Sequence, residues 1–315
     1  MTMVRSDSAA VAAAGPAVTQ PRPEPRFHLR DYAVLLKPRV MSLVVFTALV
    51  GLLLAPVPVD PLTGLIAVVC IALGAGAAGA INMWYDRDID RVMQRTMNRP
   101  LPAGRLQPRT ALWLGVALAC ASVAAMAMLI NVVAAGMLAL TIVYYVFIYT
   151  IWLKRRTPQN IVIGGASGAF PPMIGWAAAT GDVGWGAVAL FAIIFLWTPP
   201  HSWALALFRK GDYDRAGVPM LPVVAGEKET RRQMLIYTAL LLPATLLPVA
   251  IGGSGWPYAA AAVVLGALFA HRTIRVWRSA DVRAARSLFF FSILYLFLIF
   301  AALLLDRAAA TVLGV

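Results

Sequence analysis

The stretch Ala80-Ile-Asn-Met-Trp-Tyr-Asp-Arg-Asp-Ile-Asp-Arg91 ends a long apolar segment and begins a charged one. It carries Asn82, Asp86 and Asp90 at a spacing of four residues. Each step of four residues turns an α-helix by about 400°, so the three side chains drift by only about 80° around it. We therefore predict a transmembrane helix whose inner end carries one amide and two carboxylates on a single face.

This oxygen-rich face favours a divalent metal. Hard cations such as Mg²⁺ take oxygen ligands and usually keep waters and phosphate oxygens as well. Carboxylates at the mouth of a membrane bundle are costly unless they are paired or metal-bound, so their presence indicates a function. We predict catalytic and metal-binding roles for Asn82, Asp86 and Asp90. The guanidinium groups of Arg95 and Arg99, which follow, suit the oxygens of a bound diphosphate.

The composition of the whole chain is that of a membrane protein. Of its 315 residues, 61% are hydrophobic and only 13% are charged, and a soluble domain built this way would expose a largely apolar surface. Long apolar runs separated by short charged connections predict an all-α polytopic membrane protein. We predict nine transmembrane helices, at residues 40–56, 62–84, 110–130, 132–153, 160–179, 184–207, 234–252, 256–271 and 287–305.

Lys and Arg residues are confined to one side of the predicted bundle. Of the 27 in the chain, 26 lie in the amino-terminal tail or in alternate connections, and only Arg307 lies on the other side. The positive-inside rule then predicts a cytoplasmic amino terminus, an outer carboxyl terminus and an active site that faces the cytoplasm. The net charge of +13 is thus first a topology signal and second an attraction to anionic membrane lipid. Nucleic acid is excluded as a partner, because no soluble basic domain exists to bind it.

The chain divides into a tail and one membrane domain. Residues 1–31 are rich in Ala, Pro and Arg and predict a disordered cytoplasmic tail, whereas residues 32–315 predict a single transmembrane domain. Two inner loops, at about residues 86–108 and 209–232, are longer than the outer connections and mix acidic with basic residues. We expect these loops to cap the site. They follow the second and sixth spans, which suggests two analogous halves with a binding site between them.

The second inner loop supplies further candidates. Asp212 lies beside Arg209 and Lys210 at the end of a predicted helix, and we assign it to the catalytic site. Asp214, two residues later, would point in another direction on a continuing helix. Four cations on the inner side are predicted to bind diphosphate together with those of the first loop: Lys154, Arg155, Arg209 and Lys210.

The fifth and sixth spans contain polar residues and proline pairs. Gln159 and Asn160 at the inner end of the fifth span are candidate site residues. The sixth span is expected to be broken at Pro199-Pro200. His201, which follows, either binds or orients a ligand or bonds a backbone group freed by the prolines. Four aromatic residues fill the inner half of the fourth span, and we expect one or two of them to face the substrate and stabilise a carbocation: Tyr144, Tyr145, Phe147 and Tyr149.

Carboxylates and cations at one end of an apolar bundle suit a substrate with a diphosphate head and a long apolar tail. A metal bridging the carboxylates and the diphosphate would neutralise the leaving group as an allylic C–O bond breaks. Arg and Lys would donate hydrogen bonds to the departing group, and exclusion of water would protect the reactive cation. The pattern therefore predicts prenyl transfer.

Asn82-x-x-x-Asp86-x-x-x-Asp90 with the arginines after it resembles the first aspartate-rich motif of the UbiA-type intramembrane prenyltransferases. The resemblance implies the fold of that family, nine helices around a central cavity, over residues 32–305. Several stretches are similar to one branch of it, the protohaem IX farnesyltransferases (haem O synthases): Leu36-Lys-Pro-Arg-Val40, Asn98-Arg-Pro-Leu-Pro102, Thr157-Pro-Gln-Asn-Ile-Val-Ile-Gly-Gly165, Pro171-Pro172, His201-Ser-Trp-Ala-Leu-Ala206 and Ala216-Gly-Val-Pro-Met-Leu-Pro222.

This branch implies specific chemistry. Farnesyl diphosphate would be the donor, protohaem IX the acceptor, Mg²⁺ the cofactor and haem O the product, with water supplying a hydroxyl group. His201 would lie on the haem side. The resemblance also implies a bacterial inner membrane and a downstream haem A synthase as a partner.

The chain departs from the wider family at one motif. Many members carry a second Asp-x-x-x-Asp before the glycine that corresponds to Gly217, but here that spacing falls on Arg209 and Tyr213. Only Asp212 is carried over from it, and Arg209 or Lys210 would replace a metal by direct charge. Two other functions stay open. One is prenylation of a quinone precursor or a chlorin, and the other is a transporter, which would place charges at mid-membrane in both halves.

Overall fold

A computed structural model of the chain describes residues 28–279 and 281–313. The predicted tail therefore lies outside the described residues except for its last four positions. In the described part, every regular element is a helix. The first half of the chain forms α1 (Leu29–Leu35), α2 (Pro38–Leu54), α3 (Pro61–Tyr85), α4 (Arg87–Val92), α5 (Pro108–Leu129), α6 (Val132–Val143) and the π-helix η1 (Tyr144–Leu153). The second half forms α7 (Asn160–Gly164), α8 (Ala166–Ala169), α9 (Pro171–Thr180), α10 (Trp185–Phe208), α11 (Lys210–Arg215), α12 (Leu221–Val224), α13 (Gly226–Ala244), α14 (Leu247–Ala250), α15 (Trp256–Ser279) and α16 (Val282–Leu313).

The predicted membrane bundle of about nine spans is confirmed. Among the described residues, eight helical segments are long and apolar enough to cross a membrane, and α1 with α2 makes a ninth that is bent by 52°. The bend falls at Lys37, whose φ of 52° is left-handed. Pro38 follows it, and the residue before a proline is disfavoured in the right-handed helical region. α2 therefore begins in a new direction, with Pro38 in its first turn.

The spans differ from the predicted ones at their inner ends. α13 begins at Gly226 rather than at residue 234, so the second inner loop is shorter than expected. Its first turns are charged, and Arg231 Nη2 bonds Glu227 Oε2 across 2.6 Å one turn away. Such i,i+4 pairs support a helix beyond its apolar run.

α3 begins with an N-cap. Asp60 accepts a hydrogen bond from the Thr63 N–H at 2.9 Å, and Pro61 occupies the first turn.

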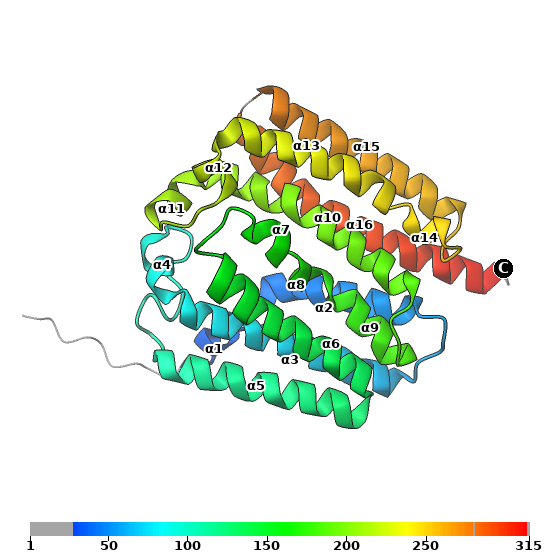
Figure 1. Cartoon of the computed structure of the whole chain (residues 1–315). Coiled ribbons are helices and arrows are strands. Elements are labelled where there is room, and N and C mark those ends of the chain that lie inside the picture. The colour runs from blue at the N-terminus through cyan, green and yellow to red at the C-terminus, as the bar shows by residue number, and fades with distance from the viewer. Residues whose placement is uncertain (1–27, 280, 314–315) are drawn as a thin grey trace, which may run out of the picture.

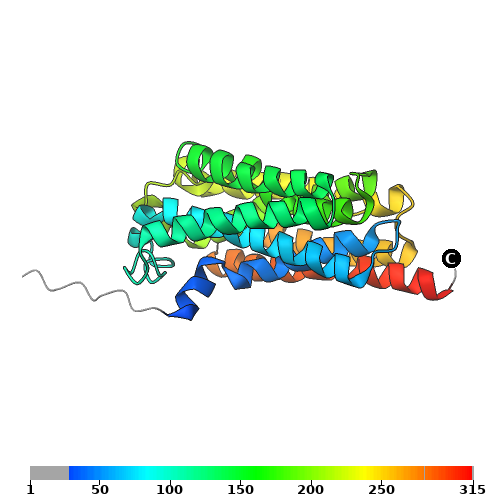
Figure 2. The same ribbon diagram turned by 90° about the horizontal axis from the view of Figure 1, so that it is seen from below.

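The inner loops and the carboxyl terminus lie at opposite ends of the bundle (Figures 1 and 2). α1, α4, α11 and α12 lie at one end, whereas α14 and the end of α16 lie at the other. A chain that starts at one end and finishes at the other crosses the bundle an odd number of times. The predicted cap loops therefore occupy a common end, together with the inner end of α3.

Helices α2 and α9 pack backbone to backbone. A Cβ added at Gly51 would lie 2.0 Å from Pro172 O, and one added at Gly175 would lie 2.0 Å from Ala48 O. Small residues permit this approach within a membrane. It fixes α2, which begins at Lys37, against the span that begins with α7.

The two proline pairs behave differently from each other. The fifth span is broken into α7, α8 and α9, with Pro171 opening α9. The predicted break in the sixth span is wrong, because α10 continues through Pro199 and Pro200. α10 packs against α13 on one side and α16 on another, and packed neighbours allow a membrane helix to tolerate proline.

Candidate active site

The amide and the two carboxylates of the acidic stretch are all buried. Asn82 lies in the last turn of α3, Asp86 caps that helix, and Asp90 lies in α4; their exposed fractions are 4%, 1% and 3%. The backbone bonds Asp86 N–Asn82 O and Asp90 N–Asp86 O, at 2.9 and 2.8 Å, carry the helical spacing across the junction. Asn82 Nδ2 donates to Asp86 Oδ2 at 2.7 Å. The three predicted side chains therefore follow one another from the end of α3 into α4.

Cations from other elements meet the two carboxylates. Lys154, just beyond η1, donates from Nζ to Asp86 Oδ2. Arg155 Nη2 lies 3.5 Å from Asp86 Oδ1. Arg99 Nη1 bonds Asp90 Oδ2 at 2.8 Å. Buried carboxylates require such partners, and three of the predicted diphosphate-binding cations supply them here.

Arg155 also binds an acidic residue that sequence reasoning did not select. Its two terminal nitrogens bond the two oxygens of Asp88 at 2.7 Å each, and its guanidinium lies over the Tyr85 ring at 4.8 Å. The hydrogen bond from Arg155 holds the pKa of Asp88 below its usual range. Asp88 is exposed, so this pair belongs to the rim of the site.

Lys37 is a site residue to which the sequence analysis gave no role. Its Nζ donates to Asn82 Oδ1 at 2.8 Å. It is the one non-glycine residue with positive φ in the described part of the chain. Strained backbone of this kind is often found at functional sites. Lys37 lies within the stretch Leu36-Lys-Pro-Arg-Val40 that resembles the family branch, but the direction of its side chain depends on the bend between α1 and α2.

A cavity of about 330 Å³ opens beside these groups. Its polar residues near the inner end are Lys37, Asn82, Asp90, Arg95, Arg99, Lys154 and Asn160. Its apolar part extends along α3 to Ile71, eleven residues before Asn82 and therefore about 16 Å away along the helix. The charged end and the apolar interior thus belong to one cavity.

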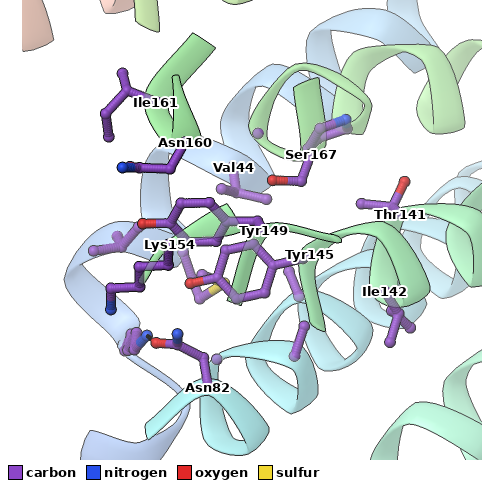
Figure 3. Close-up of a pocket in the computed structure, with 18 of the residues that line it drawn as sticks. Val44, Asn82, Thr141, Ile142, Tyr145, Tyr149, Lys154, Asn160, Ile161 and Ser167 are labelled. Atoms are coloured by element: carbon purple, nitrogen blue, oxygen red, sulfur yellow. Dashed lines mark hydrogen bonds between the residues drawn. The ribbon is translucent and has the colours of Figure 1, made fainter. Parts of the chain in front are cut away.

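The π-helix η1 supplies the aromatic wall. Tyr145 and Tyr149 line the cavity, as expected for two of the four aromatics, with ring centroids 5.3 Å apart (Figure 3). The backbone hydrogen bonds of a π-helix join residues five apart, and Lys154 N accordingly donates to Tyr149 O at 2.9 Å. Its wider turn also lets Thr150 accept a hydrogen bond from Asn82 Nδ2 at 3.1 Å. No sequence pattern had indicated a π-helix.

The two inner loops meet at Asp212. The Gln94 N–H donates to Asp212 Oδ1 at 3.3 Å, and Arg215 Nη2 bonds the same oxygen at 2.5 Å. Asp212 is buried, and Arg209 Nη1 lies 3.9 Å from its Oδ2. Lys210 points to Glu227, 3.8 Å away.

Several predicted site residues are not among the described residues that line the cavity: Asp86, Arg155, Arg209, Lys210, Asp212 and His201. Asp86 and Arg155 contact lining residues directly, as above. Gln159 is exposed and also lies outside the lining, whereas Asn160 lies within it. The second loop instead contributes Tyr213, Val218 and Met220.

His201 lies between α10 and α16. Its ring is stacked between Trp197 and Phe289, at centroid distances of 4.3 and 4.7 Å. Its Nδ1 lies 2.6 Å from the Ser292 hydroxyl, which itself donates to Phe289 O. The partner of this ring nitrogen is therefore a side chain rather than a backbone group freed by the prolines.

The fold and the cavity define an intramembrane enzyme with a cation-rich mouth and an apolar interior. The UbiA prenyltransferase family matches residues 44–305 of the sequence, and the chain belongs to this family. The protein named protoheme IX farnesyltransferase from Parvibaculum lavamentivorans is 58% identical over 282 residues, which cover 88% of this chain and 89% of that one.

Solved structures share the fold. A UbiA homolog from Aeropyrum pernix K1 is 25% identical with a TM-score of 0.66, and covers 86% of this chain and 98% of its own. A UbiA homolog from Archaeoglobus fulgidus bound to DMAPP and Mg²⁺ is 16% identical with a TM-score of 0.60, covering 86% and 99%. The helical bundle is therefore that of the family.

Proposed function

We propose that this protein joins the farnesyl group of farnesyl diphosphate to one carbon of a vinyl group of protohaem IX and the hydroxyl group of a water to the other, which gives haem O and releases diphosphate. The observation that carries the proposal is the single cavity in which a cation-rich mouth continues into an apolar interior. The relatives named protoheme IX farnesyltransferase, at 54–59% identity, support this acceptor over a quinone precursor or a chlorin.

The cations of the mouth are proposed to exchange partners when the donor binds. Lys37, Lys154 and Arg99 now bond Asn82, Asp86 and Asp90, respectively. A diphosphate would offer these cations further charged acceptors, because Lys and Arg make charge-assisted bonds to phosphate as well as to carboxylate. Arg95 lines the same cavity and would bind the diphosphate with them. Arg155, Arg209 and Lys210 would act from the rim.

The carboxylates suit Mg²⁺ in their chemistry. Asp90 lines the cavity, and its Oδ1 has no hydrogen-bond partner among the described residues. Asp86 Oδ1 has only the long contact to Arg155. No group of three or more acidic, His or Cys side chains gathers into a ready-made metal site in the described part of the chain. We propose that Asp86 and Asp90 hold Mg²⁺ together with the diphosphate, and Asn82 joins them if Lys37 turns away. When bound, Mg²⁺ neutralises charge on the leaving group.

The chain's own residues guide the transfer. The C1–O bond of the donor breaks, and its electron pair leaves with the diphosphate held by Lys154 and Arg99. The faces of Tyr145 and Tyr149 stabilise the allylic cation. The vinyl π electrons then form the bond to C1. Asp212 positions the first loop through Gln94 rather than touching the substrate. His201 stays a prediction on the haem side.

The proposed orientation rests on the distribution of Lys and Arg, and the proposed membrane rests on the family resemblance. We propose a bacterial inner membrane, with the amino terminus and the cavity mouth in the cytoplasm. The farnesyl chain would lie in the apolar interior, among residues that include Ile71 and Ile174. Haem A synthase, which would take the product, stays a predicted partner.

A labelling experiment that offers the protein two alternative acceptors tests the proposal. Labelled farnesyl diphosphate is supplied to membranes that contain the protein, with protohaem IX or with an aromatic quinone precursor. Label should be incorporated into haem. This incorporation should stop when EDTA is added and resume when Mg²⁺ is restored. Label in the aromatic acceptor alone would show a sister activity, and indifference to EDTA and Mg²⁺ would contradict the metal site.

A further inference from the structure

Asn160 presents an unfilled acceptor at the cavity. Its side chain lines the cavity and the residue is only 1% exposed. Its Nδ2 donates to Thr157 O at 2.6 Å, whereas its Oδ1 has no hydrogen-bond partner among the described residues. The amide cannot be reversed, because its oxygen would then face the Thr157 carbonyl oxygen. A buried acceptor left unfilled is destabilising, so a donor from outside the protein is expected to fill it.

Tyr149 presents its hydroxyl on the same side of the cavity as Asn160 (Figure 3). Asn160 and Gly164 are four residues apart on α7 and so share a face. The Tyr149 ring packs on that face, since a Cβ added at Gly164 would lie 2.2 Å from its Cδ2. The hydroxyl end of Tyr149 points to the same side as Asn160 and Lys154 in Figure 3. No protein group among the described residues bonds this hydroxyl either.

The chemistry of these two atoms selects the ligand. Diphosphate oxygens only accept hydrogen bonds, so they cannot fill Asn160 Oδ1. Water can donate to Asn160 Oδ1 and also bond the Tyr149 hydroxyl, and a buried water requires two or more such partners.

A water at this place would decide the outcome of the proposed reaction, on which this inference rests. When the vinyl group bonds C1, a positive charge remains on the vinyl carbon next to the porphyrin. That carbon either loses a proton to give an alkene or bonds a water to give an alcohol. We propose that Asn160 and Tyr149 hold the water that adds. Its oxygen forms the new C–O bond and its proton passes to the released diphosphate anion, so no oxidant or reductant is required.

Product masses test the role of this pair. The full-length protein in membranes is given farnesyl diphosphate, Mg²⁺ and protohaem IX, and the extracted haems are separated by mass into farnesylated alcohol and farnesylated alkene. In Asn160→Leu, the ratio of alcohol to alkene should fall about tenfold, as expected for the loss of one hydrogen bond. Tyr149→Phe, which keeps the ring, should lower the ratio in the same direction.

Gln159→Leu is the matched control, because it makes a similar amide-to-leucine change at the neighbouring exposed position. Its product ratio should equal that of the wild type. An unchanged ratio in both Asn160→Leu and Tyr149→Phe would overturn the water site while leaving farnesyl transfer intact. If Asn160→Leu does not fold, an unchanged ratio in Tyr149→Phe would overturn it alone. A folded wild type that makes neither product would instead overturn the proposed function.

Discussion

The backbone N–H of Gln94 donates a hydrogen bond to Asp212 Oδ1 across 3.3 Å, and this contact joins the two inner loops. Gln94 is followed by Arg95, which lines the cavity. Asp212 lies outside the lining, yet it is buried and also bonds Arg215. We therefore propose that it acts on the site through the first loop, and that it positions Arg95 rather than binding substrate.

Asp212→Ala should accordingly loosen the first loop. We expect the KM for the diphosphate donor to rise by about tenfold, as for the loss of one hydrogen bond to a charged group, with a smaller change in kcat. Asp214→Ala is the control, because Asp214 is exposed on the same helix α11. Equal effects of the two substitutions on donor KM would contradict the positioning role. Steady-state kinetics with varied donor concentration measure both.

Substitutions of Asp86 and Asp88 compare a buried carboxylate in the site with an exposed carboxylate at its rim. Asp86 is buried against Lys154, whereas Asp88 is exposed and paired with Arg155. Asp86→Asn should lower kcat by at least about 100-fold, since it removes one of the carboxylates proposed to hold Mg²⁺ beside the leaving group. Asp88→Asn should change kcat by less than about threefold, as an exposed ion pair contributes little. Similar rates for the two variants would rule out the assignment of Asp86.

Lys37 should act on donor binding. Lys37→Asn keeps a residue type that tolerates positive φ but removes the cation next to Asn82. The donor KM should rise by about tenfold, as expected when a charge-assisted hydrogen bond is lost. Arg39→Asn removes a cation two residues away, at an exposed position, and should leave the KM near that of the wild type. Titration of the donor against both purified variants measures the difference, and equal KM values would contradict the role of Lys37.

Gly164 is required by the position of the Tyr149 ring. The added Cβ of Gly164→Ala would lie 2.2 Å from Tyr149 Cδ2, so the ring or helix α7 must move. We expect a loss of roughly 1–3 kcal/mol in the free energy of unfolding, typical of overpacking, together with lower kcat. Gly136→Ala meets nothing within 4 Å and should not destabilise the protein. Thermal unfolding in detergent compares them, and equal midpoints would disprove this packing.

The architecture could be predicted from the sequence because membrane spans have a strong local signal. Apolar length fixed the spans, and the one-sided distribution of Lys and Arg indicated which connections lie together. The i,i+4 spacing predicted that Asn82, Asp86 and Asp90 follow one another. The distribution of Lys and Arg predicted that Arg99 and Lys154 lie at the same end of the bundle. These inferences depend on short stretches of chain.

Contacts between distant segments could not be predicted. Lys37 reaches Asn82 only because the chain bends before Pro38, and Lys154 N bonds Tyr149 O because η1 is a π-helix. The break expected at Pro199 failed because packing against α13 and α16 outweighs a local helix breaker. In each case the deciding interaction is tertiary.

The most direct test is the mass of haem extracted from membranes that contain the protein and have been supplied with farnesyl diphosphate, protohaem IX and Mg²⁺. We predict a haem heavier by a farnesyl group plus one water. This product should be absent with Asp90→Asn, because the substitution removes a carboxylate that lines the cavity. Unmodified haem with folded wild-type protein would contradict the acceptor. Equal product from Asp90→Asn would contradict the site.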